Sequence, residues 1–275
     1  EANIIDMDMA KNNNISDALL DRLFLDESRL DNIISGVYNI INLEDPIGSE
    51  IKRWKPSNGI DMCQTRVPIG VIGIIYESRP NVTADASTLA LKSGNCIILR
   101  GGSESFYSSS AIINSIKNGL KSSQLSEDCV NMVNTIDRDA VGLLLNMHKY
   151  VNLIIPRGGK ALIERVQIDS KIPVLSHLDG LCHTYIDVDA NKEMAINIVL
   201  NAKMRRTGIC GATETLLCHK DVIINILPDI INKLIEQGCE IRADKNIKVL
   251  NHNIKNATIE DWQTEYLDKI LSIKT

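Results

Sequence analysis

The residue of this sequence best suited to nucleophilic chemistry is a cysteine in a polar, basic loop. Cys210 follows three basic residues, Lys203, Arg205 and Arg206. Nearby positive charge favours the thiolate, which is the nucleophilic form of the side chain. The other six cysteines lie in apolar runs or beside predicted elements, and only Cys182, next to His183, competes with it. The alternative, that Cys210 is simply a small loop residue, stays open at this point.

A polar segment between a buried strand and a helix offers a second group. Asn81 ends the stretch Tyr76–Asn81. Its side-chain amide is a donor of the kind that stabilises the oxyanion formed when a nucleophile attacks a carbonyl. The alternative, that Asn81 only caps the helix that follows, is the commoner role for asparagine at such a place.

Two glycine turns each follow an apolar run and open a predicted helix. They are Arg100-Gly101-Gly102-Ser103 and Pro156-Arg157-Gly158-Gly159-Lys160. Free backbone N–H groups at such turns suit a pyrophosphate, and the basic side chains add positive charge. Neither turn matches G-x-G-x-x-G, so ordinary turn glycines stay an alternative for each alone. Their shared topological position favours a nucleotide site.

A short stretch rich in polar side chains, His177–His183, gives further candidates. Its spacing does not fit a metal site, and we predict none. His177, Asp179 and His183, together with Arg206 in the cysteine loop, are the candidates for contact with a substrate or its phosphate. The alternative is that the histidines are structural.

Alternating strands and helices must position these groups. Buried strands are expected at four apolar runs: residues 67–75, 96–99, 130–133 and 151–155. Helices are expected between them, at about residues 82–93, 104–120 and 138–145. Strands that alternate with helices form βαβ units, so the fold class is α/β with a parallel sheet.

A second α/β region is expected from residue 177 onward, which divides the chain into residues 1–176 and 177–275. Its predicted strands and helices are residues 184–188, 192–203, 215–218, 222–237, 247–250 and 270–273. Before the first sheet, Ser16-Asp17 is predicted to cap a short helix through Leu25, and Asp26 to open a longer one. A turn at Asn58-Gly59 is expected to precede a strand at 60–66.

The bulk composition argues against several classes of function. The net charge is -5 and the pI is about 5.6, so a nucleic-acid-binding or membrane-binding surface is not expected. No apolar run reaches the roughly 18 residues that span a bilayer, and the N-terminus has no signal-peptide pattern. An odd number of cysteines without a C-x-x-C pair favours free thiols in a reducing cytoplasm.

Long, ordered strings of this sequence resemble the γ-glutamyl phosphate reductases, a family of the aldehyde dehydrogenase superfamily. The strings are Val67–Thr83, Leu91–Asn95, Ile98–Glu104, Ile154–Lys160, His177–Gly180, Asn201–Lys203 and, with Cys210, Glu214–Leu217. They cover nearly the whole chain in order, and chance does not explain such a match.

The resemblance implies an aldehyde-dehydrogenase-like fold, with a Rossmann-type parallel-sheet cofactor domain, an α/β catalytic domain and a small oligomerisation element. Residues 1–176 would form N-terminal helices and the NADPH-binding domain, and residues 177–275 the catalytic domain. Cys210 would be the nucleophile, with Asn81 and the Cys210 N–H as oxyanion donors. NADPH would lie along three segments: Glu77-Ser78, Arg100-Gly101-Gly102-Ser103-Glu104 and Pro156-Arg157-Gly158-Gly159-Lys160.

The implied reaction is the reduction of L-glutamyl 5-phosphate to L-glutamate 5-semialdehyde plus phosphate, the second step of proline biosynthesis from glutamate. The cysteine would expel phosphate and form a thioester, which NADPH would reduce. In oxidative members of the superfamily a glutamate base stands where His177 stands here. Without that base, water is expected to attack the thioester less readily.

The sequence departs from the family pattern in two ways. Gly211 follows the cysteine where the family usually has Asn, so a more mobile loop and a different acyl pocket are expected. The C-terminal part that completes the family's catalytic domain is absent, and the N-terminal helix is short, so an incomplete enzyme is expected. Expected partners are the substrate, functional coupling to glutamate 5-kinase, and further copies of the chain in a homo-oligomer.

Three other interpretations stay open. Another thioester-forming aldehyde dehydrogenase, which uses coenzyme A or oxidises an aldehyde, fits the cysteine, although the strings Glu77–Asn81 and Pro156–Lys160 argue against it. A non-catalytic remnant fits the absent C-terminal part, and an unreactive Cys210 would favour it. A bifunctional protein that also carries the kinase is the third.

Overall fold

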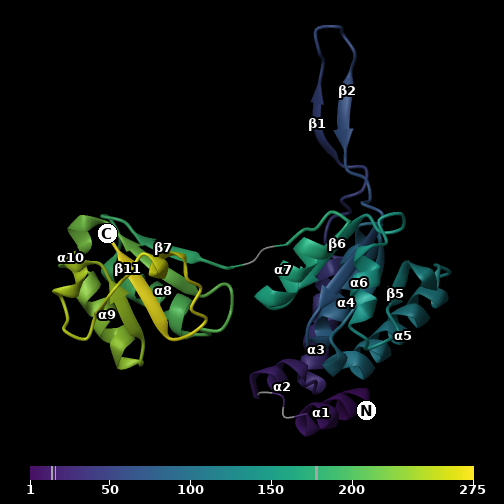
Figure 1. The fold of residues 1–275 in the computed structure, drawn as a ribbon. Coiled ribbons are helices and arrows are strands. Elements are labelled where there is room, and N and C mark those ends of the chain that lie inside the picture. The colour runs from purple at the N-terminus through teal and green to yellow at the C-terminus, as the bar shows by residue number, and fades with distance from the viewer. Residues whose placement is uncertain (14, 16, 177–178) are drawn as a thin grey trace. The chain divides into compact units, whose positions relative to one another are not determined.

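The chain folds into two compact units, Glu1–Ser176 and His177–Thr275. The computed structural model describes residues 1–13, 15, 17–176 and 179–275. Each unit is built around its own parallel sheet with helices packed against it (Figure 1), which confirms the predicted α/β class. No helix among these residues is both long and apolar enough to cross a membrane.

Unit 1, Glu1–Ser176, contains a sheet of four parallel strands within the described residues, in the order β5-β4-β3-β6. The strands are β3 (Val71–Tyr76), β4 (Cys96–Arg100), β5 (Val130–Met132) and β6 (Leu153–Arg157). Each overlaps one of the four predicted apolar runs, because Val, Ile and Leu suit strands that are covered on both faces. The bounds differ by up to four residues: β3 begins at Val71 and not at Val67, and β6 extends two residues further, to Arg157.

Helices cover both faces of this sheet. They are α4 (Pro80–Lys92), α5 (Phe106–Ser122), α6 (Asp139–Leu145) and α7 (Lys160–Asp169), with 3₁₀ turns at Ser103–Ser105 and Glu127–Cys129. Ile75 packs into a core with side chains of α6 and α7, whereas Tyr76 packs into a core with side chains of α4 and α5. Successive strand residues face opposite sides of a sheet, so β3 contributes to both cores.

Helices α1 (Ala2–Asn12), α2 (Asp17–Leu23) and α3 (Glu27–Ile41) precede the sheet. The predicted start of α3 is confirmed, since the Asp26 carboxylate accepts a hydrogen bond from the Arg29 N–H at 2.8 Å. Ser16, predicted as part of the cap of α2, lies outside the described residues. Helix α2 ends at Leu23, two residues before the predicted end.

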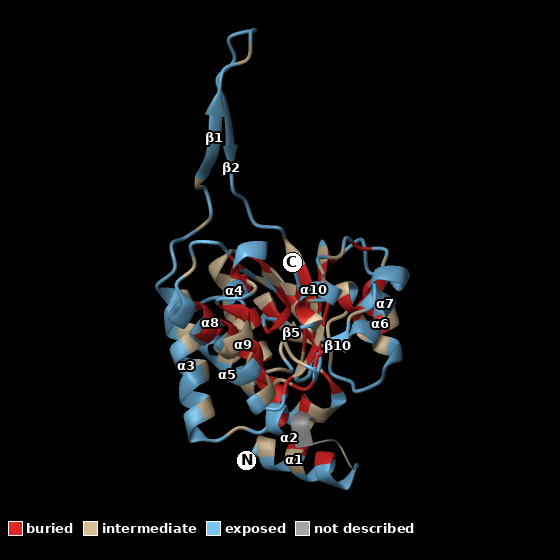
Figure 2. Cartoon of the chain, turned by 90° about the vertical axis from the view of Figure 1, so that its left-hand side faces the viewer, coloured by how far each residue is buried: buried red, intermediate tan, exposed pale blue. Residues whose placement is uncertain are grey.

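An antiparallel hairpin of β1 (Glu50–Trp54) and β2 (Met62–Thr65) extends from the rest of unit 1 (Figure 2). Every residue of both strands is exposed. The predicted turn is confirmed, because Gly59 has a φ of 80°, which glycine adopts without steric cost. The hairpin therefore buries no side chain of its own strands within this chain.

Unit 2, His177–Thr275, contains a second parallel sheet, which has the order β10-β9-β11-β8-β7 in the part of the chain that the structure describes. The strands are β7 (Cys182–Ile186), β8 (Thr213–Cys218), β9 (Glu240–Ala243), β10 (Lys255–Asn256) and β11 (Ile270–Lys274). The helices are α8 (Lys192–Met204), α9 (Leu227–Glu236) and α10 (Lys245–Lys248), with 3₁₀ turns at Lys220–Val222 and Glu260–Gln263. Val199 and Ile230 of the helices pack with Leu216 and Leu271 of the sheet in one buried cluster.

One predicted strand of unit 2 is wrong. Residues 247–250 begin in the last turn of α10, which the Asp244 carboxylate caps by accepting two backbone hydrogen bonds. The strand of this region is β9, in which polar residues alternate with Ile241 and Ala243, so it lacks a continuous apolar run. The predicted helix at 222–237 begins too early. Helix α9 begins at Leu227, where Pro228 suits the first turn of a helix.

Candidate active site

Cys210 lies on an open turn between α8 and β8 in unit 2. Its side chain is exposed. The Ala212 N–H donates to the Ile209 carbonyl oxygen at 2.9 Å, which closes the turn around the cysteine. Nothing lies within 4 Å of the place where a Cβ on Gly211 would stand. The predicted nucleophile is therefore reachable, and the residue after it meets no steric constraint.

Several other thiols are held in the protonated, unreactive form. Burial raises the pKa of Cys218 to about 11 and the pKa of Cys239 to about 11. Burial also raises the pKa of Cys96. Cys63 is exposed on the hairpin, but its hydrogen bond with Glu50 raises its pKa. Since the thiolate is the nucleophile, these four thiols are poor candidates for covalent chemistry near neutral pH.

The start of unit 2 lies against the cysteine loop. A Cβ on Gly180 would stand 2.7 Å from the Cys210 carbonyl oxygen and 2.9 Å from the Cys210 Cβ, so only glycine fits there. The Cys182 thiol donates to the Cys210 carbonyl oxygen at 3.2 Å. Cys182, the competing nucleophile, therefore supports the loop that carries Cys210.

The predicted substrate contacts of unit 2 are distributed around this loop. Asp179, His183 and Arg206 are all exposed. The His183 Nδ1 lies 2.7 Å from the Leu181 carbonyl oxygen. His177 lies outside the described residues. Their roles toward a substrate stay predictions.

Lys203 does not contribute charge to the thiol's surroundings in the way that was predicted. Its side chain is 0% exposed, and its Nζ lies 2.6 Å from Oε2 of Glu214, whose side chain is 1% exposed. The other Glu214 oxygen accepts the Leu267 N–H at 3.2 Å. Because Lys203 lies in the last turn of α8 and Glu214 is the second residue of β8, this buried ion pair joins the two ends of the Cys210 loop.

In unit 1 the predicted cofactor segments leave neighbouring strands at one edge of the sheet. β3 pairs in parallel with β4 and β6, so that Ile75 lies opposite Arg100 and Tyr76 lies opposite Arg157. Glu77 and the two glycine turns therefore emerge together at the carboxyl ends of the strands, where sheets of this kind bind ligands.

The turn after β6 is occupied by a carboxylate. Glu77 Oε2 accepts a hydrogen bond from the Gly159 N–H at 2.9 Å. A Cβ on Gly158 would stand 2.6 Å from Glu77 Cδ, so Gly158 makes room for this carboxylate. The prediction of free N–H groups is thus wrong at Gly159. A carboxylate at a helix N-terminus is stabilised by the helix dipole, as a phosphate would be.

The turn after β4 contains buried polar atoms without a partner. Within the described residues, Arg100 Nε and Glu104 Oε2 have no hydrogen-bond partner. Arg100 is 8% exposed, and its Nη2 donates to the Ile136 carbonyl oxygen at 3.1 Å. Burial lowers the pKa of Arg100. Since buried polar atoms are nearly always paired in native proteins, these two atoms fit a polar ligand such as a dinucleotide.

Ser78 links the turns after β3 and β4. Its φ of 41° lies in the left-handed region, and it is buried. Its nitrogen stands 3.1 Å from the place of a Cβ on Gly102, so glycine allows the close approach of the two turns. Strained backbone of this kind is typical of ligand sites. The remaining predicted cofactor residues are mostly exposed: Pro156 is buried, Gly101 is half-buried, and Ser103, Arg157, Gly158, Gly159 and Lys160 are exposed.

Asn81 lies in the first turn of α4 but does not cap it. The N-cap residue is Arg79, whose side chain makes no capping hydrogen bond, so the capping alternative is wrong. Asn81 Nδ2 donates to Asp85 Oδ2 at 3.1 Å. A primary amide has two N–H groups, so one stays free for another acceptor. The role of Asn81 as an oxyanion donor stays a prediction.

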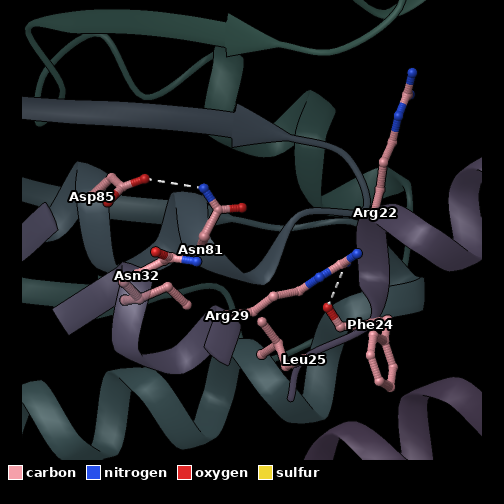
Figure 3. A pocket seen from close by; sticks show the side chains of 8 residues that line it. Arg22, Phe24, Leu25, Arg29, Asn32, Asn81 and Asp85 are labelled. Carbon is pink, nitrogen blue, oxygen red and sulfur yellow. Dashed lines mark hydrogen bonds between the residues drawn. The ribbon is translucent and has the colours of Figure 1, made fainter. Parts of the chain in front are cut away.

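Asn81 and Asp85 line a hollow of about 230 Å³ in unit 1 (Figure 3). Its other lining residues come from α2, α3 and the turn between them: Arg22, Phe24, Leu25, Arg29, Asn32 and Ile33. Sequence reasoning missed this set. The spacing of four residues between Asn81 and Asp85 could have linked those two on one helix face, whereas the other contacts join distant segments.

The chain is similar to known proteins over nearly its whole length. Residues 35–269 match the aldehyde dehydrogenase family. The chain is 49% identical over 272 residues to a γ-glutamyl phosphate reductase of Rhodospirillum rubrum, which is 99% of this chain and 64% of that protein. It is 51% identical over 275 residues to a γ-glutamyl phosphate reductase of Bartonella tribocorum, which is 100% of this chain and 67% of that protein.

A solved structure of a similar protein agrees with the fold. The crystal structure of γ-glutamyl phosphate reductase from Thermotoga maritima superimposes with a TM-score of 0.91 at 41% identity, and the match covers 99% of this chain and 66% of that one. The chain thus spans less than two thirds of the length of the Rhodospirillum rubrum relative, 64%.

Proposed function

The chain belongs to the aldehyde dehydrogenase family and, within it, to the γ-glutamyl phosphate reductases, and from this premise we propose that it reduces L-glutamyl 5-phosphate to L-glutamate 5-semialdehyde and phosphate. This is the second step of proline biosynthesis from glutamate. The observation that carries the proposal is the exposed Cys210 on its open turn, backed by Gly180 and Cys182.

The proposed chemistry begins at the Cys210 sulfur. The thiolate attacks the γ-acyl carbon, a C–S bond forms, and the C–O bond to phosphate breaks with its electron pair on the departing phosphate. The free amide N–H of Asn81 and the Cys210 N–H are the proposed donors to the oxyanion. After reduction of the thioester the C–S bond breaks, and the aldehyde leaves while the sulfur returns to its starting state.

NADPH, when bound, supplies the hydride that reduces the thioester. Its proposed binding segments are Glu77-Ser78, Arg100-Gly101-Gly102-Ser103-Glu104 and Pro156-Arg157-Gly158-Gly159-Lys160. The unpaired Arg100 Nε and Glu104 Oε2 support this choice, because a dinucleotide offers acceptors for the first and hydroxyl donors for the second. Arg157 and Lys160 are exposed cations beside the same edge and suit its phosphates.

The remaining roles complete the proposal. His177, Asp179, His183 and Arg206 are proposed to contact the substrate. The fully exposed hairpin of β1 and β2 is the proposed contact between copies in a homo-oligomer, because its apolar residues gain a partner there. Functional coupling to glutamate 5-kinase would supply the labile acyl phosphate. We place the enzyme in the cytoplasm, where thiols stay reduced.

Oxidation of NADPH tests the proposal. The assay contains L-glutamate, ATP and a γ-glutamyl kinase, which makes the acyl phosphate in place, and it follows NADPH absorbance. Cys210→Ala should lower the rate at least about a thousandfold, because the covalent route is lost. Cys129→Ala removes a half-buried thiol in the 3₁₀ turn Glu127–Cys129, to which no role is assigned, and should leave the rate unchanged.

Two results would reject this function. A Cys210→Ala protein that oxidises NADPH as fast as the unaltered protein would exclude the thioester. Faster NADPH oxidation with an acyl coenzyme A than with the acyl phosphate would favour the coenzyme A alternative instead.

A further inference from the structure

The hollow beside Asn81 combines apolar walls with charges of both signs. Leu25 and Ile33 are half-buried and supply apolar surface. The charged lining residues are Arg22, Arg29 and Asp85. A small site with few, well-separated polar groups on an apolar lining is suited to orient one small molecule. A molecule that carries both charges and a short methylene chain matches this lining.

Asp85 is a partly buried carboxylate that has no cationic partner among the described residues. In the part of the chain that the structure describes, its hydrogen-bond partner is the Asn81 amide, at 3.1 Å, and no ion pair reaches it. Burial raises the pKa of Asp85, and the Asn81 hydrogen bond only partly offsets that effect. An ammonium group bound beside a desolvated carboxylate stabilises its ionised form.

The two arginines of the hollow differ. Arg29 is held by the protein, because its guanidinium donates to the Phe24 carbonyl oxygen at 3.0 Å and pairs with Asp21. Arg22 is exposed and has no hydrogen bond or ion pair to any described residue. Figure 3 shows the Arg22 side chain extended away from Asn81 and Asp85, so its guanidinium does not neutralise the Asp85 carboxylate.

We propose that this hollow binds the α-amino-acid end of the substrate. Asp85 pairs with the α-ammonium group, and the methylene chain lies against Leu25 and Ile33. The exposed Arg22 side chain turns in over the hollow to pair with the α-carboxylate on the same carbon. The inference rests on the proposed function, since Asn81, the proposed oxyanion donor, lines the same hollow. A volume of about 230 Å³ is below that of pockets for drug-sized ligands, roughly 300–1,000 Å³, and suits an amino acid.

The proposal has a consequence for specificity. A glutamyl phosphate whose amino group is acylated has no cation for Asp85, so it leaves that carboxylate desolvated and unpaired. A site built to pair a polar group rejects the analogue that lacks it more strongly than an apolar pocket rejects a change of size. Asp85 is therefore the residue that selects the free α-amino acid.

Binding of a stable analogue tests this site. The probe is L-glutamate γ-methyl ester, titrated calorimetrically into the protein. Asp85→Asn and Arg22→Gln should each raise its Kd at least about tenfold, which is about 1.4 kcal/mol of lost binding. Asp31→Asn is the matched control, because Asp31 is an exposed carboxylate of α3 that does not line the hollow, and its Kd should not change.

A change on the ligand side keeps the test independent of how the variants fold. N-acetyl-L-glutamate γ-methyl ester should bind the unaltered protein at least about tenfold more weakly than the free amino acid ester. In Asp85→Asn this difference should shrink to less than about twofold, because the partner of the ammonium group is gone.

Three outcomes would overturn the inference: no binding of the ester to the unaltered protein, equal binding of the free and N-acetylated esters, or unchanged binding by both variants. They are distinguishable from failure of the proposed function. Full activity of Cys210→Ala would reject the thioester chemistry without affecting ester binding, whereas a loss of ester discrimination would leave the thioester chemistry standing.

Discussion

The sheet edge of unit 1 and the Cys210 loop of unit 2 differ in how their buried polar groups are paired. At the edge, Arg100 Nε and Glu104 Oε2 are without partners among the described residues. In the Cys210 loop region, Lys203 and Glu214 are buried more deeply still, and they pair with each other at 2.6 Å. The edge is the proposed ligand site, and its unpaired polar atoms suit that role, whereas the loop proposed to hold the Cys210 thiol in place satisfies its own polar groups.

The largest loss of stability is expected when the Lys203–Glu214 ion pair of unit 2 is broken, which leaves a buried polar group unpaired as at the edge of unit 1. Lys203→Met leaves the Glu214 carboxylate buried without its cation, so the free energy of unfolding of unit 2 should fall by about 3–5 kcal/mol. Denaturant unfolding followed by fluorescence of Trp262, which lies in unit 2, measures it.

The double variant Lys203→Met/Glu214→Leu is the control for that experiment. It removes both charges and leaves only the Leu267 N–H to find a new partner, so most of the lost stability should return. Equal losses in the single and double variants would mean that the ion pair contributes through packing alone, and the contrast between the two regions would not hold.

A smaller loss of stability is expected at the sheet edge of unit 1, where the Glu77 carboxylate, unlike Arg100 Nε and Glu104 Oε2, has a hydrogen-bond partner. Gly158→Ala puts a methyl group 2.6 Å from Glu77 Cδ, so the hydrogen bond to the Gly159 N–H must break or the turn must shift. The close atoms belong to side chains that can move, so unfolding of unit 1 should become easier only by about 0.5–1.5 kcal/mol, the contribution of the lost hydrogen bond. NADPH should bind more weakly in a fluorescence titration.

Gly142→Ala is the matched control in the same unit. Gly142 lies inside α6, and nothing stands within 4 Å of its added Cβ. This change should stabilise unit 1 by about 0.5–1 kcal/mol, because alanine is the better helix former. A Gly158→Ala protein that unfolds like Gly142→Ala would show that Glu77 does not need the space.

The smallest effect is expected next to Cys210, the proposed nucleophile. No atom lies within 4 Å of a Cβ on Gly211, so Gly211→Ala should change the free energy of unfolding by no more than about 0.5–1 kcal/mol, in the stabilising direction. Thermal unfolding measures it. A loss of unfolding free energy larger than about 1 kcal/mol would mean that the turn around Cys210 is as closely packed as the glycine turns of unit 1. The two regions would then not differ in packing.

Much of the fold followed from the sequence, because its determinants are local. The runs that became β3, β4, β5 and β6 are mostly apolar, with Asn131 and Asn152 as exceptions, and such runs specify strands wherever both faces are covered. Strand β9 escaped prediction because its buried Ile241 and Ala243 alternate with charged residues. Residues 247–250 were mistaken for a strand because Ile247 and Leu250 pack against the core from the end of a short helix and the turn after it, while Val249 is exposed.

The sequence by itself determined the parallel α/β sheets, the cysteine on a polar loop and the family to which the chain belongs. Only the tertiary structure decided which groups are left for a ligand: Lys203 is used up by Glu214, the Gly159 N–H by Glu77, and one Asn81 N–H by Asp85. The physical reason is the difference in sequence separation over which these interactions act. Strand and turn preferences act between neighbours along the chain, whereas the pairing of a buried charge depends on which distant segment folds against it.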